Sequence, residues 1–169
     1  VTGIYIYDHN VFKATSTLQP SWRNELEISD VHQWYIDNGY KVGYKEITGW
    51  WKDTGKPIDL IEGNSLLLSE LEHNIECNVH EDTRIQGRVQ IGKGTVIDKN
   101  TIIRGPVKIG EDCSITNSYI GPYTALGDRV QVTDTEIEHS MIFDEARLQC
   151  NKRIVDSIIG KNAELISFE

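Results

Sequence analysis

A carboxylate stands in a short loop, Gly49–Gly55, that is bounded by glycines and also carries two tryptophans. Within the stretch Trp51-Lys52-Asp53-Thr54-Gly55, Asp53 supplies the hard oxygen ligand that Mg²⁺ prefers. Trp51 offers a flat apolar surface on which a sugar ring can lie. An isolated aspartate in a turn is more often a cap or a turn residue. By itself, the loop therefore leaves a metal ligand and an ordinary turn residue as two open interpretations.

The elements that would position this loop are mixed α and β over residues 1–71. Alternating apolar residues predict strands over Val1–Tyr7 and Tyr40–Thr48. Helical spacing and end signals predict helices from Val11 to about Leu18, over Glu27–Asn38, and from Pro57 to about Leu71.

From Val79 onward the chain has a short repeat. Large aliphatic residues recur every six positions, with occasional steps of five, and a smaller residue often follows four positions later. The large residues are Val79, Ile85, Ile91, Ile97, Ile103, Ile109, Ile115, Ile120, Leu126, Val132, Ile137, Ile142, Leu148, Ile154, Ile159 and Leu165. Such a period is typical of a coil that stacks on itself, with each copy forming one face of a triangular prism. Shortened corners are expected at Asn117-Ser118, His139-Ser140 and Asp156-Ser157.

This repeat resembles the hexapeptide-repeat left-handed parallel β-helix, and the resemblance covers residues 79–166. That fold is an exception to the right-handed crossover rule. The open ends of such a prism need covers, and the helix at 57–71 is expected to cap the first coil. Cys113 occupies an inward, small-residue position, which predicts a packed core thiol.

Three further segments occur in a characteristic order: Val1-Thr2-Gly3-Ile4-Tyr5-Ile6-Tyr7-Asp8, Pro20-Ser21-Trp22-Arg23-Asn24-Glu25-Leu26-Glu27-Ile28-Ser29-Asp30, and the Trp51–Gly55 stretch. Together they resemble the later half of a sugar-phosphate nucleotidyltransferase. Within that family they are most similar to glucose-1-phosphate thymidylyltransferases that carry a β-helix tail. Asn24 stands where the family usually has glycine.

The resemblance implies the fold and the division of the chain. Residues 1–71 would be the C-terminal α/β remnant of a nucleotidyltransferase (Rossmann-like) domain. Residues 72–169 would be a left-handed parallel β-helix. Val1 opens directly on an apolar strand and the chain stops at Glu169 without a polar cap, so both ends are expected to be cut.

The resemblance also implies roles for single residues. Asp53 would be one of two carboxylates that hold the catalytic Mg²⁺, and Arg23 would contact the phosphate of the sugar phosphate. Val1 (through its backbone), Tyr5 and Trp51 would line the sugar pocket. Glu25 and Glu27 remain ambiguous between support of the site and favourable carboxylates near a helix start.

The implied reaction transfers a nucleotidyl group from a nucleoside triphosphate, dTTP in the closest resemblance, to glucose-1-phosphate and releases pyrophosphate. Positioning and charge neutralisation would suffice, without a covalent intermediate. The family's glycine-rich triphosphate loop and second metal aspartate have no match in these residues, so the 169-residue chain alone is expected to be inactive. The base preference and the sugar epimer are left open.

Two alternatives from other classes remain. Hexapeptide β-helices also occur in acyltransferases that use a histidine base between subunits, and His80 and His139 lie in or beside the repeat. A lone surface histidine is far more often an ordinary polar residue. The other alternative is a non-catalytic assembly or regulatory module, in which the prism provides contacts in a homo-oligomer.

Composition excludes other classes. The net charge of −9 argues against a general nucleic-acid binder, which would show a basic face. No apolar run approaches the roughly 18 residues needed to span a bilayer. The three cysteines are far apart and predict neither a disulfide set nor a metal-ligand pair, so a reducing, cytoplasmic setting is expected.

Overall fold

The computed structural model describes residues 2–167 of the chain. Its contacts divide the chain into two compact units, Val1–Trp51 and Lys52–Glu169. The helix predicted over the end of the first 71 residues therefore belongs with the repeat in the second unit.

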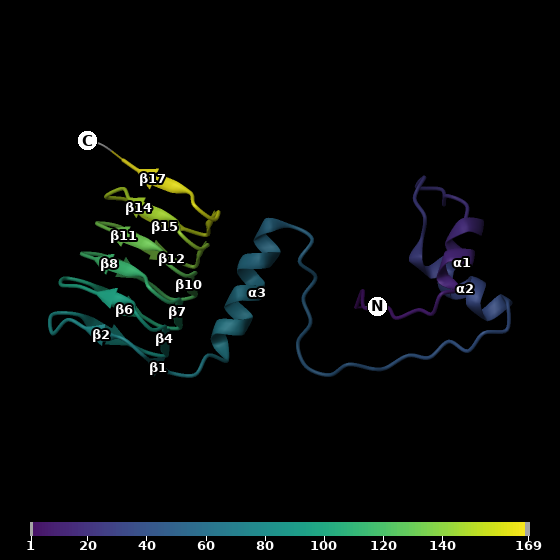
Figure 1. Cartoon of the computed structure of the whole chain (residues 1–169), viewed down its shortest axis with the longest axis horizontal. Helices are drawn as coiled ribbons and strands as arrows, with labels where there is room; N and C mark the ends of the chain where they lie inside the picture. Colours follow the sequence, from purple (N-terminus) through teal and green to yellow (C-terminus); the bar gives the residue numbers. More distant parts are fainter. Residues whose placement is uncertain (1, 168–169) are drawn as a thin grey trace. The chain divides into compact units, whose positions relative to one another are not determined.

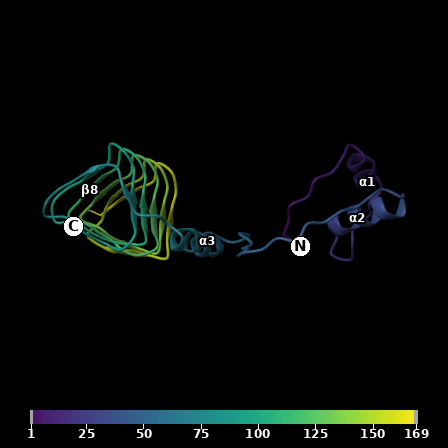
Figure 2. The ribbon, with the colours of Figure 1, turned by 90° about the horizontal axis from the view of Figure 1, so that it is seen from below.

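The second unit contains a parallel β-helix, as the spacing of aliphatic residues predicted. Figure 2 shows its strands superimposed into a triangular outline, with one sheet on each side. The first sheet contains β1 (Asn74–Ile75), β4 (Val89–Ile91), β7 (Val107–Ile109), β10 (Thr124–Leu126), β13 (Met141–Ile142) and β16 (Ile158–Ile159). The second contains β2 (Asn78–Val79), β5 (Val96–Ile97), β8 (Ser114–Thr116), β11 (Gln131–Thr133), β14 (Arg147–Gln149) and β17 (Glu164–Ile166). The third contains β3 (Arg84–Gln86), β6 (Ile102–Arg104), β9 (Tyr119–Ile120), β12 (Glu136–Glu138) and β15 (Arg153–Val155).

The register of these strands places aliphatic residues directly above one another in successive coils. Ile97 pairs with Ile115, and Ile115 pairs with Val132. The large residues of successive coils thus form continuous interior columns, and Ile103, Ile115, Ile120 and Ile137 are fully buried. Small residues close the corners from inside, among them Thr101 and Cys113, which are also buried. This interior is the hydrophobic core of the unit.

The corners use the left-handed backbone region. The residues with positive φ in the β-helix, apart from glycine, are Asn100, Asp112, Asn117, Tyr123, Arg129, Asp134, His139, Glu145, Asn151, Asp156 and Asn162. Asn and Asp tolerate this region better than other non-glycine residues, which explains their frequency here. At the predicted short corners, the serine that follows turns its hydroxyl back onto the chain: Ser118 donates to the Thr116 carbonyl and Ser140 to the Glu138 carbonyl, each at 2.7 Å.

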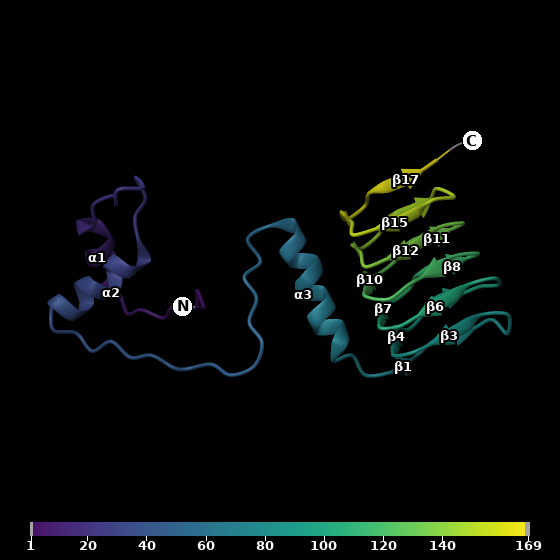
Figure 3. The same cartoon turned by 180° about the vertical axis from the view of Figure 1, so that it is seen from behind.

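Helix α3 (Pro57–Ser69) begins with proline, as predicted, but its position differs from the expectation. It does not cap the first coil. It runs along the outside of the prism, against the first sheet (Figures 1 and 3). The Asn64 side-chain amide donates to the Tyr123 carbonyl at 3.2 Å, which places the helix beside the middle coils. Ile61 and Leu68 bury their side chains on this side of the helix.

The first unit contains α1 (Val11–Thr17) and α2 (Ile28–Asp37), close to the predicted bounds. Ala14, Val31 and Tyr35 form its small core. The strands predicted over 1–7 and 40–48 are absent from the described residues of both segments. The reason is physical: a strand needs a partner for its backbone hydrogen bonds, and every strand pair in the described residues belongs to the β-helix. Ile6 and Tyr44 are instead almost fully exposed.

Among residues 2–167, none of the helices has both the length and the apolar character that crossing a lipid bilayer requires.

Candidate functional site

The loop that carries Asp53 is tied to the start of α3. Lys52 Nζ lies 3.1 Å from Asp59 Oδ1 and 2.5 Å from Glu62 Oε2. The other oxygen of Asp59 accepts a hydrogen bond from the Lys56 backbone N–H at 2.9 Å. These contacts connect the residue before Asp53 to the first turns of the helix. The site residue is therefore held by neighbours that the sequence motif did not single out.

The pKa values of Lys52 and Asp59 both respond to this arrangement. Hydrogen bonding to Glu62 and then to Asp59 raises the pKa of Lys52. The same contact with Lys52, followed by the Lys56 backbone, lowers the pKa of Asp59. The two helix carboxylates are therefore engaged by a cation. Sequence reasoning missed this cluster because the predicted helix start at Pro57 does not indicate which helix carboxylates meet Lys52.

Asp53 differs from these carboxylates. It is exposed, and within residues 2–167 no hydrogen bond or ion pair engages its side chain. In the same range no group of three or more His, Cys, Asp or Glu side chains is arranged to hold a metal ion. An exposed, unengaged carboxylate fits a Mg²⁺ ion whose other ligands are waters and substrate phosphates. Asp53 thus fits the predicted role as one ligand.

Arg23 is oriented by a neighbouring carboxylate. Its Nη2 donates to Glu27 Oε1 at 2.7 Å and to Oε2 at 2.8 Å, and its Nε donates to Oε1 at 3.1 Å. Ser21 also donates to Glu27 Oε1 at 2.8 Å. The Arg23 contacts, followed by that of Ser21, lower the pKa of Glu27. Of the two glutamates whose roles the sequence left open, Glu27 is the one that pairs with Arg23.

The remaining arginine nitrogen, Nη1, makes no hydrogen bond within the described residues, and the side chain is half exposed. A guanidinium that is fixed along one edge and open along the other can still donate to a phosphate oxygen. The contact with Glu27 is therefore compatible with the predicted role.

The predicted sugar-pocket residues are Val1, Tyr5 and Trp51. Val1 lies outside the described residues. Tyr5 packs among aromatic rings, with its ring centre 5.2 Å from that of His32 and 6.3 Å from that of Tyr7. Trp51 is exposed. Within the described part of the first unit, no hydrogen bond, ion pair or ring stacking joins any two of Tyr5, Arg23 and Trp51.

A second feature missed from the sequence is a buried phenol in the first unit. Tyr35 donates a hydrogen bond to Asp8 Oδ1 at 2.7 Å. Burial, together with this contact to the carboxylate, raises the pKa of Tyr35 to about 12. The same hydrogen bond is the main cause of a lowered pKa at Asp8. Helical spacing predicted Tyr35 on the apolar face of its helix, but no sequence signal linked its hydroxyl to Asp8.

The two candidate histidines of the repeat are both engaged. His80 Nδ1 accepts from the Asp82 backbone N–H at 3.1 Å. His139 has contacts at both ring nitrogens: Nδ1 lies 2.5 Å from Asp156 Oδ1, and Nε2 lies 3.0 Å from Ser65 Oγ. Both ring nitrogens of His139 are therefore engaged by side chains of the same chain. Because a histidine base can carry such contacts, they leave the acyltransferase alternative open.

Comparison with known proteins gives two family matches. Residues 1–70 match the nucleotidyl transferase model, and residues 88–118 match the bacterial transferase hexapeptide model, which has six repeats. The resemblance inferred from the three ordered motifs and the repeat is therefore confirmed for both parts of the chain.

Curated relatives match nearly the whole chain. Glucose-1-phosphate thymidylyltransferase of Streptomyces antibioticus is 39% identical over 98% of this chain and 46% of its own length. The enzyme of that name from Streptomyces griseus is 37% identical over 99% of this chain and 47% of its own length. Low-salt glycan biosynthesis nucleotidyltransferase Agl11 of Haloferax volcanii is also 37% identical, over 96% of this chain and 46% of its own length. The chain thus spans about half the length of these relatives, and it resembles nucleotidyl transferases in residues 1–70 and hexapeptide-repeat transferases in the β-helix.

Proposed function

We propose that this chain is part of a nucleotidyltransferase that joins a nucleoside monophosphate unit to glucose-1-phosphate and releases pyrophosphate. The observation that carries the proposal is the identity of 37–39% to glucose-1-phosphate thymidylyltransferases across almost the entire chain. Those relatives are named for thymidylyl transfer, so dTTP is the nucleotide we propose. The exposed and unengaged Asp53 supports the proposal from the side of the structure.

Two side chains of this chain would serve the reaction. Arg23, braced by Glu27, would bind and orient the phosphate of the sugar phosphate through its open edge. Asp53, in the loop anchored through Lys52, would hold Mg²⁺. When bound, Mg²⁺ supplies charge neutralisation on the phosphates.

The chemical step needs no activated side chain. A phosphate oxygen of glucose-1-phosphate attacks the α-phosphorus in line, the bond from that phosphorus to the bridging oxygen breaks, and pyrophosphate leaves. Because the attacking oxygen is already anionic, the contribution of the protein is alignment and electrostatic stabilisation. No proton has to be taken from the nucleophile.

Asp53→Asn tests the proposal in the full-length protein that contains this chain. The substitution keeps the size of the side chain and removes the charge. We expect pyrophosphate release to fall by about a hundredfold or more, as for loss of one preorganised electrostatic contact. Glu81→Gln, which neutralises another exposed carboxylate, is the matched control and should behave like the wild type. Near-normal turnover in Asp53→Asn would refute the metal role.

The homo-oligomer and the cytoplasmic setting expected from the sequence are also retained as proposals. Large apolar residues are exposed on outer faces of the prism, with Val96 on the second sheet and Ile102 and Val155 on the third. Apolar side chains exposed on these two faces are available for contact with another subunit. Sedimentation velocity of the chain and of a Val96→Lys variant tests this: we expect an oligomer that the lysine weakens, and a wild-type monomer would exclude it.

A further inference from the structure

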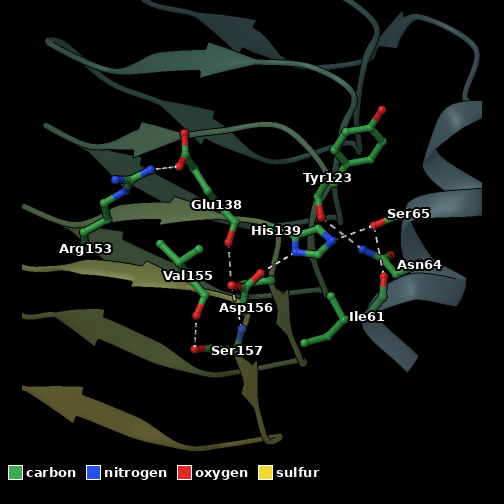
Figure 4. Close-up of polar contacts among 11 residues, drawn as sticks. Ile61, Asn64, Ser65, Tyr123, Glu138, His139, Arg153, Val155, Asp156 and Ser157 are labelled. Carbon is green, nitrogen blue, oxygen red and sulfur yellow. Dashed lines mark hydrogen bonds and ion pairs between the residues drawn. The ribbon is translucent and has the colours of Figure 1, made fainter. Parts of the chain in front are cut away.

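Helix α3 and the β-helix are joined by a polar contact at one corner of the prism (Figure 4). Nε2 of His139 lies 3.0 Å from Ser65 Oγ on the helix, and Nδ1 of the same ring lies 2.5 Å from Asp156 Oδ1 on the next coil. One residue before Ser65, the Asn64 amide reaches the Tyr123 carbonyl. The contacts come from residues 59 and 74 positions away in sequence, so they are tertiary links and not local turns.

The hydrogen bonds at this corner are mutually consistent. The Ser65 hydroxyl lies within hydrogen-bond distance of the Ile61 carbonyl in the helix, at 3.0 Å, and of Nε2 of His139. The Asp156 carboxylate accepts from Nδ1–H of the same ring. Ser65, His139 and Asp156 then form a continuous chain from the helix to the coil, which we call the clamp.

Apolar packing alone does not fix the position of α3 on the first sheet. Ile61 and Leu68 are buried, but Leu67, one residue away from Leu68, is exposed. A groove of about 520 Å³ remains between the helix and the first sheet, lined by Leu67, Leu68, Ala125 and Met141 among others. Apolar contact is non-directional, so it does not fix the rotation of the helix or its position along the prism. The directional contacts of the clamp can fix both.

The other end of α3 holds the loop of Asp53. Lys52 pairs with Asp59 and Glu62 on the first two turns. A Cβ placed on Gly63 would lie 4.0 Å from the Thr54 methyl carbon, so the loop also lies close to the helix surface beyond these ion pairs. A rigid helix that is fixed at Ser65 therefore determines where its first turns, and with them Lys52 and the adjacent Asp53, are held.

We propose that the His139–Asp156 pair is a positioning device: it fixes α3 on the β-helix and thereby positions the Asp53 loop. The β-helix then contributes to the metal-binding half of the site, although its residues touch neither substrate nor metal. The structural part of the proposal stands on the clamp alone, and its consequence for Mg²⁺ rests on the proposed function.

Three substitutions separate the clamp from general damage to the fold. His139→Asn removes the imidazole and keeps a residue that tolerates the φ of 44° found here; Asn117 and Asn151 already adopt similar φ values, 47° and 43°, at other corners. Ser65→Ala removes the other partner. Ser69→Ala is the matched control, because Ser69 is exposed on the same helix and its hydroxyl makes the same kind of bond to the carbonyl four residues back.

Hydrogen exchange of the 169-residue chain gives a readout without activity. The backbone amides of α3 should exchange about tenfold faster in His139→Asn and in Ser65→Ala, as expected for loss of a hydrogen bond that holds the helix on the coil. The double variant should add little, since both changes remove the same contact. Ser69→Ala should match the wild type. Unchanged exchange in both single variants would overturn the clamp.

Turnover of the full-length protein tests the consequence. In His139→Asn, the Mg²⁺ concentration that gives half-maximal pyrophosphate release should rise about fivefold. Excess Mg²⁺ should restore the rate, which a general loss of folded enzyme would not allow. Faster exchange in α3 with an unchanged Mg²⁺ requirement would overturn the positioning role. A wild-type protein that releases no pyrophosphate would refute the proposed function instead, and the exchange result would still decide the clamp.

Discussion

Two interior threonines of the β-helix should respond to the same substitution with opposite signs. Thr124 and Thr95 both point into the prism and are buried, with exposures of 0% and 2%. The Thr124 hydroxyl has no hydrogen-bond partner among the described residues. The Thr95 hydroxyl donates to the Gly110 carbonyl at 2.8 Å and accepts from the Cys113 backbone N–H at 3.0 Å. Valine has nearly the same shape as threonine and removes the hydroxyl in each case.

The magnitudes follow from these partners. A buried polar group without a partner costs about 1–3 kcal/mol, so Thr124→Val should raise the free energy of unfolding by about 1 kcal/mol. Thr95→Val removes two hydrogen bonds and takes the acceptor away from the Cys113 N–H, so it should lower that free energy by about 2–3 kcal/mol. Urea unfolding of the chain followed by circular dichroism measures both. A destabilised Thr124→Val variant would show that its hydroxyl is satisfied after all and would refute the reasoning.

Two further predictions concern the core and the pH response. Ile137→Ala should cost about 2–5 kcal/mol, because Ile137 is fully buried between coils, whereas Leu165→Ala, at a side chain 41% exposed, should cost much less; equal costs in urea unfolding would contradict the stacked core. Because the pKa of Tyr35 is raised to about 12, its neutral form stabilises the first unit fully below the ordinary phenol pKa of about 10, and that contribution is lost as the pH rises from there to about 12. Ultraviolet titration should show a phenol that titrates near pH 12, and Tyr35→Phe should remove that component; an unchanged titration curve would exclude the shift.

The β-helix could be predicted because its code is local and repeated. Each six-residue copy carries its own inward residue, so an error at one corner does not move the others. The shortened corner at Asn117 was visible as a five-residue step, and its φ of 47° accounts for it. The left-handed backbone at Arg129 and Glu145 could not be foreseen, because neither residue type favours that region.

The features that were predicted wrongly from the sequence depend on tertiary contacts. The side-on position of α3 depends on Asn64 meeting a carbonyl 59 residues away, for which helical spacing contains no signal. The alternation around Ile6 and Tyr44 indicates residues suited to a strand, but a strand also needs a neighbour. In the candidate site, the ordered motifs identified Arg23 and Asp53. The carboxylates that hold Arg23 and Lys52 became visible only with the side chains in place.

The central claim is nucleotidyl transfer to a sugar phosphate, and product analysis tests it most directly. The full-length protein is incubated with dTTP, glucose-1-phosphate and Mg²⁺, and the products are separated and quantified. We expect dTDP-glucose and pyrophosphate in equal amounts, with no free nucleoside diphosphate. The absence of any nucleotide sugar with each of the common nucleoside triphosphates, together with release of CoA from acetyl-CoA and an amino-sugar phosphate, would contradict it.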